Sequence, residues 1–195
     1  MTAFLNWTAL LLVIITATGL LLSRDWRWSL GFLAAQYLSV FWLVQAHWPI
    51  SMAAAKLVTG WMACAVLGIT EITSPTPIES ETSWPQGRLF RLLASALIVT
   101  VTFAAATRAV PWLGLSLPVA WGGLILLGMG MLHLGITAQP FRVILGILTF
   151  LAGFEVLYAA VESSILVAAL LAIVNLGLAL AGAYFMTAHS PEEIR

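Results

Sequence analysis

Residues 165–183 read ILVAALLAIVNLGLALAGA, and the only polar side chain among them is Asn175. As an α-helix rising about 1.5 Å per residue, this stretch crosses most of the roughly 30 Å hydrocarbon core of a bilayer. Residues 94–106, ASALIVTVTFAAA, are also apolar apart from small hydroxyl side chains. A strand of a membrane β-barrel alternates apolar and polar positions, and neither stretch does so. The two stretches therefore predict membrane-spanning helices.

The composition of the whole chain agrees with these two stretches. Of its 195 residues, 62% are hydrophobic and 8% are charged, and the mean hydropathy is +1.03. A soluble domain carries about 25% charged residues, so this chain has too few polar groups to cover a surface in water. The net charge is zero, which offers no electrostatic argument for binding nucleic acid. We therefore predict a multi-pass protein of the inner (cytoplasmic) membrane, in contact with the lipid bilayer.

Apolar runs of spanning length recur along the chain, so the fold class that we predict is an all-α membrane protein with about seven transmembrane helices. Prolines at 49, 111, 118 and 140 are predicted to mark helix starts or ends, because proline lacks the N–H that a helix interior needs. Glycines at 122, 123, 128, 130, 177 and 182 are predicted to allow close helix packing. The predicted helices cover residues 4–23, 27–47, 50–70, 89–109, 117–136, 141–161 and 164–187.

A weak internal repeat suggests a division of this single membrane domain, residues 1–195. GLLLSR at 19–24, followed by WSLGF at 28–32, is similar to LGITAQPFR at 134–142, followed by Leu145 and Gly146. The repeat predicts two three-helix units joined by the fourth helix, although shared hydrophobicity alone could produce it. The predicted parts are an N-terminal unit (1–70), a cytoplasmic loop (71–88), a connector helix (89–110), a C-terminal unit (111–187) and a polar tail (188–195).

The basic residues predict the orientation of the chain. With seven spans, most arginines fall on one side of the membrane and only Arg108 falls on the other. Since basic residues are enriched on the cytoplasmic side, we expect the N-terminus outside and the C-terminus in the cytoplasm. The arginines on the predicted cytoplasmic side are Arg24, Arg27, Arg88, Arg91, Arg142 and Arg195.

Two ionisable residues interrupt apolar segments and are the main candidates for function. Glu155 lies 13 residues beyond Arg142, about 20 Å into the membrane. Lys56, the only lysine, lies about 10 Å from the outer end of its helix. Buried ionisable groups can exchange protons near neutral pH. The alternatives are a neutral, hydrogen-bonded carboxyl at Glu155 and a lysine whose amine reaches the interface.

Other polar residues extend this list. Glu162 lies seven residues after Glu155, on nearly the same helix face. It is either the exit of a proton path or a solvated turn residue. His133, near the cytoplasmic end of its helix, is a further candidate proton relay or an interfacial residue. Gln36, Asn175 and Tyr158 are predicted to hydrogen-bond between helices.

The segment around Glu155 resembles the K subunit of NADH–quinone oxidoreductase (complex I). That subunit has a basic turn followed by a helix with Gly-x-Glu, and here Arg142 precedes Gly153-Phe-Glu155. The second membrane glutamate of that subunit is missing, because its region holds Ile173 and Asn175. The whole chain resembles the longer E subunit of hydrogenase-4-type and formate-hydrogenlyase-like complexes, through Gln36 in the second helix, Lys56 in the third and Glu155 in the sixth.

This resemblance implies a non-catalytic membrane subunit that contributes to proton or sodium translocation. Its partners would be large antiporter-like membrane subunits and the redox subunits of the same complex. We expect no cofactor or metal in the chain itself, because the sequence has no phosphate-binding loop, metal-ligand cluster or nucleophile–base pair. The alternatives are a structural anchor or spacer without an ion path, and a small independent transporter.

Overall fold

The computed structural model describes residues 2–74 and 87–188, and every regular element in them is an α-helix. The prediction of an all-α fold is confirmed. The helices are α1 (Thr2–Leu22), α2 (Trp26–Gln45), α3 (Ile50–Thr73), α4 (Arg88–Leu113), α5 (Leu117–Ile136), α6 (Pro140–Val161) and α7 (Ile165–Ala188).

Most helix boundaries lie within two residues of the predicted ones, and local chemistry explains several of them. Asp25 caps α2 by accepting a hydrogen bond from the Arg27 N–H at 3.0 Å, as short acidic side chains do at helix starts. Pro140 is the first residue of α6, where the missing N–H of proline costs nothing. Capping residues and prolines in the local sequence thus determine most of the helix ends.

One predicted break is wrong, because Pro111 lies inside α4 and the helix continues to Leu113. A proline in the last turn removes only one hydrogen-bond donor, which a helix end tolerates better than a helix interior does. The helix stops instead at Gly114, whose φ of 65° is left-handed and whose N–H bonds to the Val110 carbonyl at 3.0 Å. Glycine adopts this conformation without steric cost.

The predicted loop and tail fall mostly outside the described residues. α3 continues to Thr73 and α7 to Ala188, so the first residues of the predicted loop 71–88 and of the predicted tail 188–195 are helical. Residues 75–86 and 189–195 are not described. The predicted division into two units stays a prediction.

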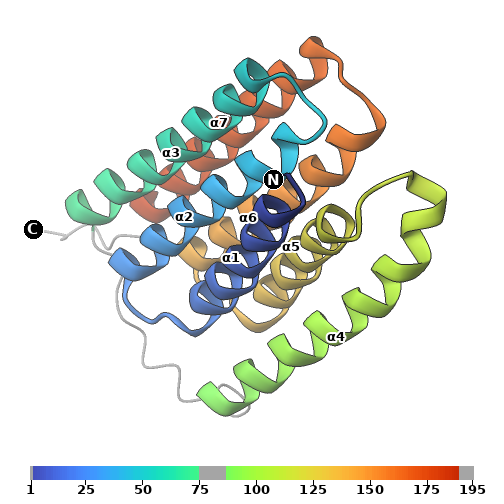
Figure 1. Ribbon diagram of the computed structural model, residues 1–195. Coiled ribbons are helices and arrows are strands. Elements are labelled where there is room, and N and C mark those ends of the chain that lie inside the picture. The colour runs from blue at the N-terminus through green and yellow to red at the C-terminus, as the bar shows by residue number, and fades with distance from the viewer. Residues whose placement is uncertain (1, 75–86, 189–195) are drawn as a thin grey trace, which may run out of the picture.

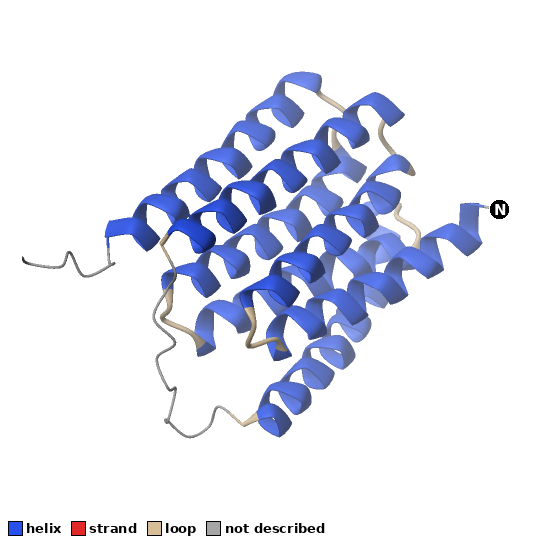
Figure 2. Cartoon of the chain, turned by 90° about the vertical axis from the view of Figure 1, so that its left-hand side faces the viewer, coloured by secondary structure: helices blue, strands red, loops and turns tan. Residues whose placement is uncertain are grey.

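Consecutive helices run antiparallel, and the described turns between them lie at two ends of the bundle (Figures 1 and 2). The α1–α2 and α5–α6 turns lie at one end, which we call the arginine end because Arg24 and Arg142 are there. The α2–α3, α4–α5 and α6–α7 turns lie at the other, which we call the far end. The helices α1, α2 and α3 form one row, and each packs against its counterpart in the second row, α5, α6 and α7. Helix α4 lies outside the rows, against α5 and α1.

Six of these helices are long and apolar enough to cross a membrane, among the described residues, and α2 is the exception. Helix α2 is less apolar because it carries polar side chains, of which Ser29, Gln36 and Ser39 are buried inside the bundle. It packs against α1, α3 and α6. By helix length and hydropathy, the chain is a multi-pass helical membrane protein.

The closest helix packing joins α5 and α6 through glycines. A Cβ atom on Gly153 would lie 2.6 Å from the Leu127 nitrogen, and one on Gly130 would lie 2.6 Å from the Phe150 nitrogen. Only glycine permits such contact between two backbones. The predicted packing role is wrong for Gly177, because a Cβ atom there would meet nothing within 4 Å.

Candidate functional site: a buried ion pair

The two ionisable residues singled out in the sequence meet in the core of the bundle. Lys56 Nζ on α3 forms an ion pair with Glu155 Oε2 on α6, and the side chains are only 5% and 2% exposed. Lys56 lies in the second turn of α3 and Glu155 in the second-last turn of α6, each about 9 Å from its helix end at the far end. The pair thus lies nearer to the far end than to the arginine end, and it links the two rows of helices.

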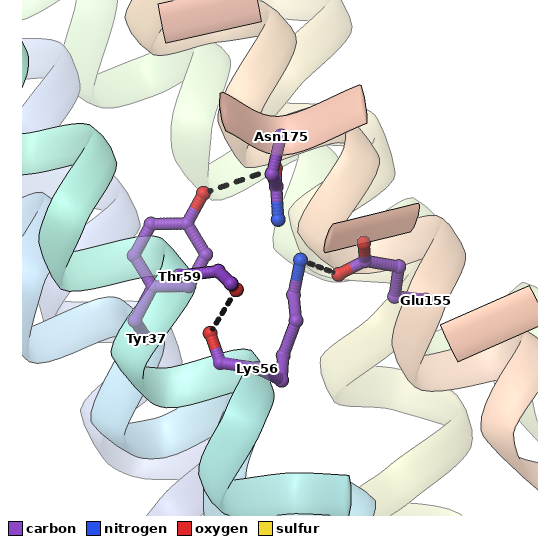
Figure 3. A network of polar contacts seen from close by, with 5 residues as sticks. All are labelled: Tyr37, Lys56, Thr59, Glu155 and Asn175. Atoms are coloured by element: carbon purple, nitrogen blue, oxygen red, sulfur yellow. Dashed lines mark hydrogen bonds and ion pairs between the residues drawn. The ribbon is translucent and has the colours of Figure 1, made fainter. Parts of the chain in front are cut away.

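Two neutral polar residues lie beside the ion pair (Figure 3). Tyr37 on α2 donates a hydrogen bond from Oη to Asn175 Oδ1 on α7, at 3.4 Å. The Lys56 amine also lies 5.5 Å from the centre of the Tyr37 ring, within the range of a cation–π contact. The ring in turn covers Gly60, where a Cβ atom would lie 2.4 Å from it. The polar cluster Tyr37, Lys56, Glu155 and Asn175 therefore joins four helices.

This polar cluster retains unused hydrogen-bonding capacity. Among the described residues, neither Glu155 Oε1 nor Asn175 Nδ2 has a hydrogen-bond partner, although both atoms are buried. The only described partners of Lys56 Nζ are the Glu155 carboxylate and the Tyr37 ring. Unpaired polar atoms are costly in an apolar interior, so this cluster is an expensive one to bury.

A pocket of about 290 Å³ extends from the ion pair toward the far end. The first turns of α3 and α7 form its walls, Trp48 lines it at the far end, and Lys56 and Glu155 lie at its inner limit. Its surface is mostly apolar, since alanine, leucine, isoleucine and methionine supply most of it.

A second polar contact lies deeper in the bundle, on the side of the pair toward the arginine end. Gln36 on α2 donates a hydrogen bond from Nε2 to Thr149 Oγ1 on α6, at 3.4 Å, and both residues are buried. Thr149 precedes Glu155 by about 9 Å along α6. The predicted interhelical roles of Gln36 and Asn175 thus each correspond to a hydrogen bond between helices.

Of two other candidates, Glu162 lies at the α6–α7 turn, and Tyr158 lies in the last turn of α6. Glu162 caps the end of α6, is exposed, and accepts a hydrogen bond from the Ser163 N–H through Oε1 at 3.1 Å. Its geometry is that of the solvated turn residue. Tyr158 is half-buried, and its ring stacks on Phe154 with centroids 5.9 Å apart.

His133 is buried in the last turn of α5, at the arginine end. It lies near Arg91 and Arg142, whose positive charges act on its imidazole. These two arginines also bond to the end of α1, because Arg91 Nη1 donates to the Leu21 carbonyl at 3.3 Å and Arg142 Nη2 to the Ser23 carbonyl at 3.1 Å. Cations favour a helix C-terminus, so the arginines stabilise α1 there. His133 is therefore in a different part of the bundle from the ion pair.

Sequence reasoning missed three residues of these polar contacts, namely Tyr37, Thr149 and Arg91. The signal for Tyr37 was present, because it follows Gln36 in a helix that is otherwise mostly apolar. The sequence of Arg91 and its neighbours indicates only orientation, whereas the structure buries its side chain, which is 4% exposed. Thr149 gave no signal, since threonine is ordinary in membrane helices.

No family model matches this chain, and neither a curated protein nor a solved structure does. The fold and the site therefore define its class by themselves: a multi-pass helical membrane protein with a buried ion pair between two helices. Within residues 2–74 and 87–188, no group of three or more His, Cys, Asp and Glu side chains is placed to hold a metal ion.

Proposed function

We propose that this chain is a non-catalytic membrane subunit of a complex I-like or membrane-hydrogenase-like redox complex, and that it contributes to proton translocation. The observation that carries the proposal is the Lys56–Glu155 ion pair. Each residue is buried within a helix of spanning length. Burying charges in a membrane is costly, and such residues mostly mark ion pathways.

The chemistry of the pair suits transfer of a proton between two helices. A proton that moves from the Lys56 ammonium to the Glu155 carboxylate converts two opposite charges into two neutral groups. The net charge stays zero in both states, so the transfer itself brings no net charge into the apolar interior. The energies of the two states can be close, because desolvation penalises the charged state while mutual attraction favours it.

The sequence resemblance supplies the proposed partners. By this resemblance, Glu155 would be the proton-relay carboxylate, and Lys56 would be a second ionisable station in the N-terminal half of the chain. Their contact offers a route for protons between the two rows of helices. Large antiporter-like subunits would provide the remaining path across the membrane, and redox subunits would provide the driving reaction. By the same proposal, the N-terminus lies outside and the arginine end faces the cytoplasm.

The first test is purification of the tagged full chain in mild detergent from its own membranes. We expect large multi-helix subunits and redox subunits to copurify with it. Recovery of the chain alone, as a monomer or homo-oligomer, would contradict a role in such a complex and favour an independent transporter.

The second test uses the purified complex in sealed vesicles. Glu155→Gln should abolish or strongly reduce proton transfer driven by the redox reaction, because glutamine cannot take up a proton. Phe154→Leu, at the neighbouring and partly exposed position, is the matched control and should pump normally. Normal pumping by Glu155→Gln would contradict the relay.

A structural spacer is the second candidate, and specific contacts favour it. The hydrogen bonds Tyr37–Asn175 and Gln36–Thr149 join α2 to α7 and α6, as polar residues do when they only hold membrane helices together. A spacer should tolerate the double variant Lys56→Met/Glu155→Gln in the pumping assay, because this variant leaves no unpaired buried charge, and it should still copurify with its partners.

A further inference from the structure

The ring of Tyr37 is held in a fixed place beside the ion pair. The side chain is fully buried. Its ring lies against the backbone of α3 at Gly60, where a Cβ atom would lie 2.4 Å from the ring atoms Cγ and Cδ1. At the other end of the ring, the hydroxyl donates a hydrogen bond to Asn175 Oδ1 on α7. The ring is thus held from two helices, α3 and α7.

The position of Gly60 explains why the Lys56 amine meets this ring. Gly60 follows Lys56 by four residues, so the two lie on one face of α3, one turn apart. A larger residue at position 60 would push the ring away from that face. As it is, the amine lies 5.5 Å from the centre of the Tyr37 ring and also pairs with the Glu155 carboxylate (Figure 3). The amine therefore contacts an aromatic ring from α2 and a carboxylate from α6.

The ring and the carboxylate respond differently when a proton moves between the two charged residues. As the proton leaves Lys56 Nζ and binds Glu155 Oε2, an N–H bond breaks, an O–H bond forms and both charges disappear. The carboxyl group can still donate a hydrogen bond to the neutral amine. The ring loses its attraction for the amine, because that attraction requires a positive charge near its π face. Tyr37 therefore favours only the state in which the proton is on Lys56.

We propose that Tyr37 is a positioning residue that holds the exchangeable proton on Lys56 in the resting protein. Desolvation favours the neutral pair, and the ring acts against it. The hydroxyl of Tyr37 has a separate role, since its proton is directed at Asn175 and it only orients the ring. As a step in proton transfer this inference rests on the proposed function, but the charge state of Lys56 can be measured without pumping.

The test uses the fact that Lys56 is the only lysine of the chain. The purified full chain, with nitrogen-15 at the lysine Nζ and in lipid nanodiscs, gives one side-chain signal in solid-state NMR. The chemical shift of this signal distinguishes ammonium from amine across a pH series. Position 37 then carries phenylalanine or its mono-, di- and trifluorinated forms. Fluorine changes the shape of the ring little but weakens the negative charge of its π face.

We expect the ratio of ammonium to amine, compared at the same pH, to fall with each added fluorine. Complete loss of the cation–π contact should lower the ratio about thirtyfold, whereas Tyr37→Phe alone should change it little. The same fluorinated series at Phe103 of α4, whose ring packs on Trp121, is the matched control and should have no effect. A ratio that does not follow the fluorine number at position 37 would overturn the proposal. Amine alone in the unsubstituted chain at neutral pH would overturn it as well.

A second pair of variants moves the ring without changing its chemistry. Gly60→Ala places a methyl group against the Tyr37 ring and should also lower the ratio of ammonium to amine. Gly31→Ala is its control, because a Cβ atom there meets nothing within 4 Å. An unchanged ratio in Gly60→Ala would contradict the positioning role.

The charge-state measurement and the pumping assay can fail separately. If the ratio ignores the fluorine series but Glu155→Gln stops pumping, the relay stands and the role of Tyr37 is wrong. If the ratio follows the series but Glu155→Gln pumps normally, Tyr37 holds the charge of a pair that does not relay protons. In that case the proposed function is contradicted and the control of charge state by the ring is supported.

Discussion

At the scale of single residues, the ion pair is the feature that most needs a physical explanation. Removing two charges from water costs several kcal/mol per ion, and their attraction offsets this cost only when the geometry is good. Lys56 and Glu155 are both almost fully buried, so each is the partner that makes the other tolerable. Their burial is thus a property of the pair.

The dependence of each charge on the other predicts the stability of the variants. Lys56→Met alone should lower the free energy of unfolding by about 3–5 kcal/mol, because it leaves Glu155 without a counter-charge. The double variant Lys56→Met/Glu155→Gln should recover most of this loss. Thermal unfolding of the purified protein in detergent measures both. Equal destabilisation by the single and the double variant would contradict the pairing.

Substitutions of Tyr37 should separate the contribution of its ring to stability from the contribution of its hydroxyl group. Tyr37→Phe removes the hydrogen bond to Asn175 and should cost only about 0.6 kcal/mol, the average for such bonds in membranes. Tyr37→Leu also removes the ring beside Lys56 and should cost clearly more, since a desolvated cation–π contact adds about 2 kcal/mol. The same unfolding assay compares them, and an equal cost would show that the ring has no role.

At the scale of elements, small residues decide which helices approach most closely. Van der Waals contact drives helix association in lipid, where burial of apolar surface gives no advantage. The glycines of α5 and α6 allow their backbones to touch, and this contact positions the helix that carries Glu155. In α7, by contrast, Gly177 faces open space.

These two kinds of glycine predict opposite results on substitution. Gly153→Ala places a methyl group 2.6 Å from the Leu127 nitrogen and 2.7 Å from the Gly123 carbonyl oxygen. It should cost about 1–3 kcal/mol, as overpacking does. Gly177→Ala is the matched control and should be neutral or slightly stabilising, because alanine favours helix. Loss of stability in Gly177→Ala alone would contradict the packing described for α5 and α6.

At the scale of the whole molecule, the alternating helices place the basic turns at one end. Ser163 and Gly87 lie at opposite ends of the bundle and are exposed. In a Cys64→Ala background, Ser163→Cys should react with an impermeant maleimide on intact cells. Gly87→Cys should react only after the membrane is opened. The reverse pattern would invert the orientation predicted from the arginines.

Much of the fold follows from local signals. Helix number, length and most boundaries can be predicted from apolar runs, prolines and caps such as Asp25, because these effects act within a few residues. The importance of Lys56 and Glu155 can also be predicted, since an ionisable group in an apolar run is costly wherever the helix packs. The end of α4 could not be predicted from the sequence, because both Pro111 and Gly114 are residues that can end a helix.

The sequence by itself determined that the chain forms membrane helices and which of their residues are costly to bury. Only the tertiary structure decided that Lys56 and Glu155 meet, that Tyr37 and Asn175 surround them, and that a pocket leads to them. The physical reason is that lipid and a neighbouring helix are about equally apolar. Hydropathy therefore cannot indicate which helices become neighbours, and close packing among many small residues makes that choice.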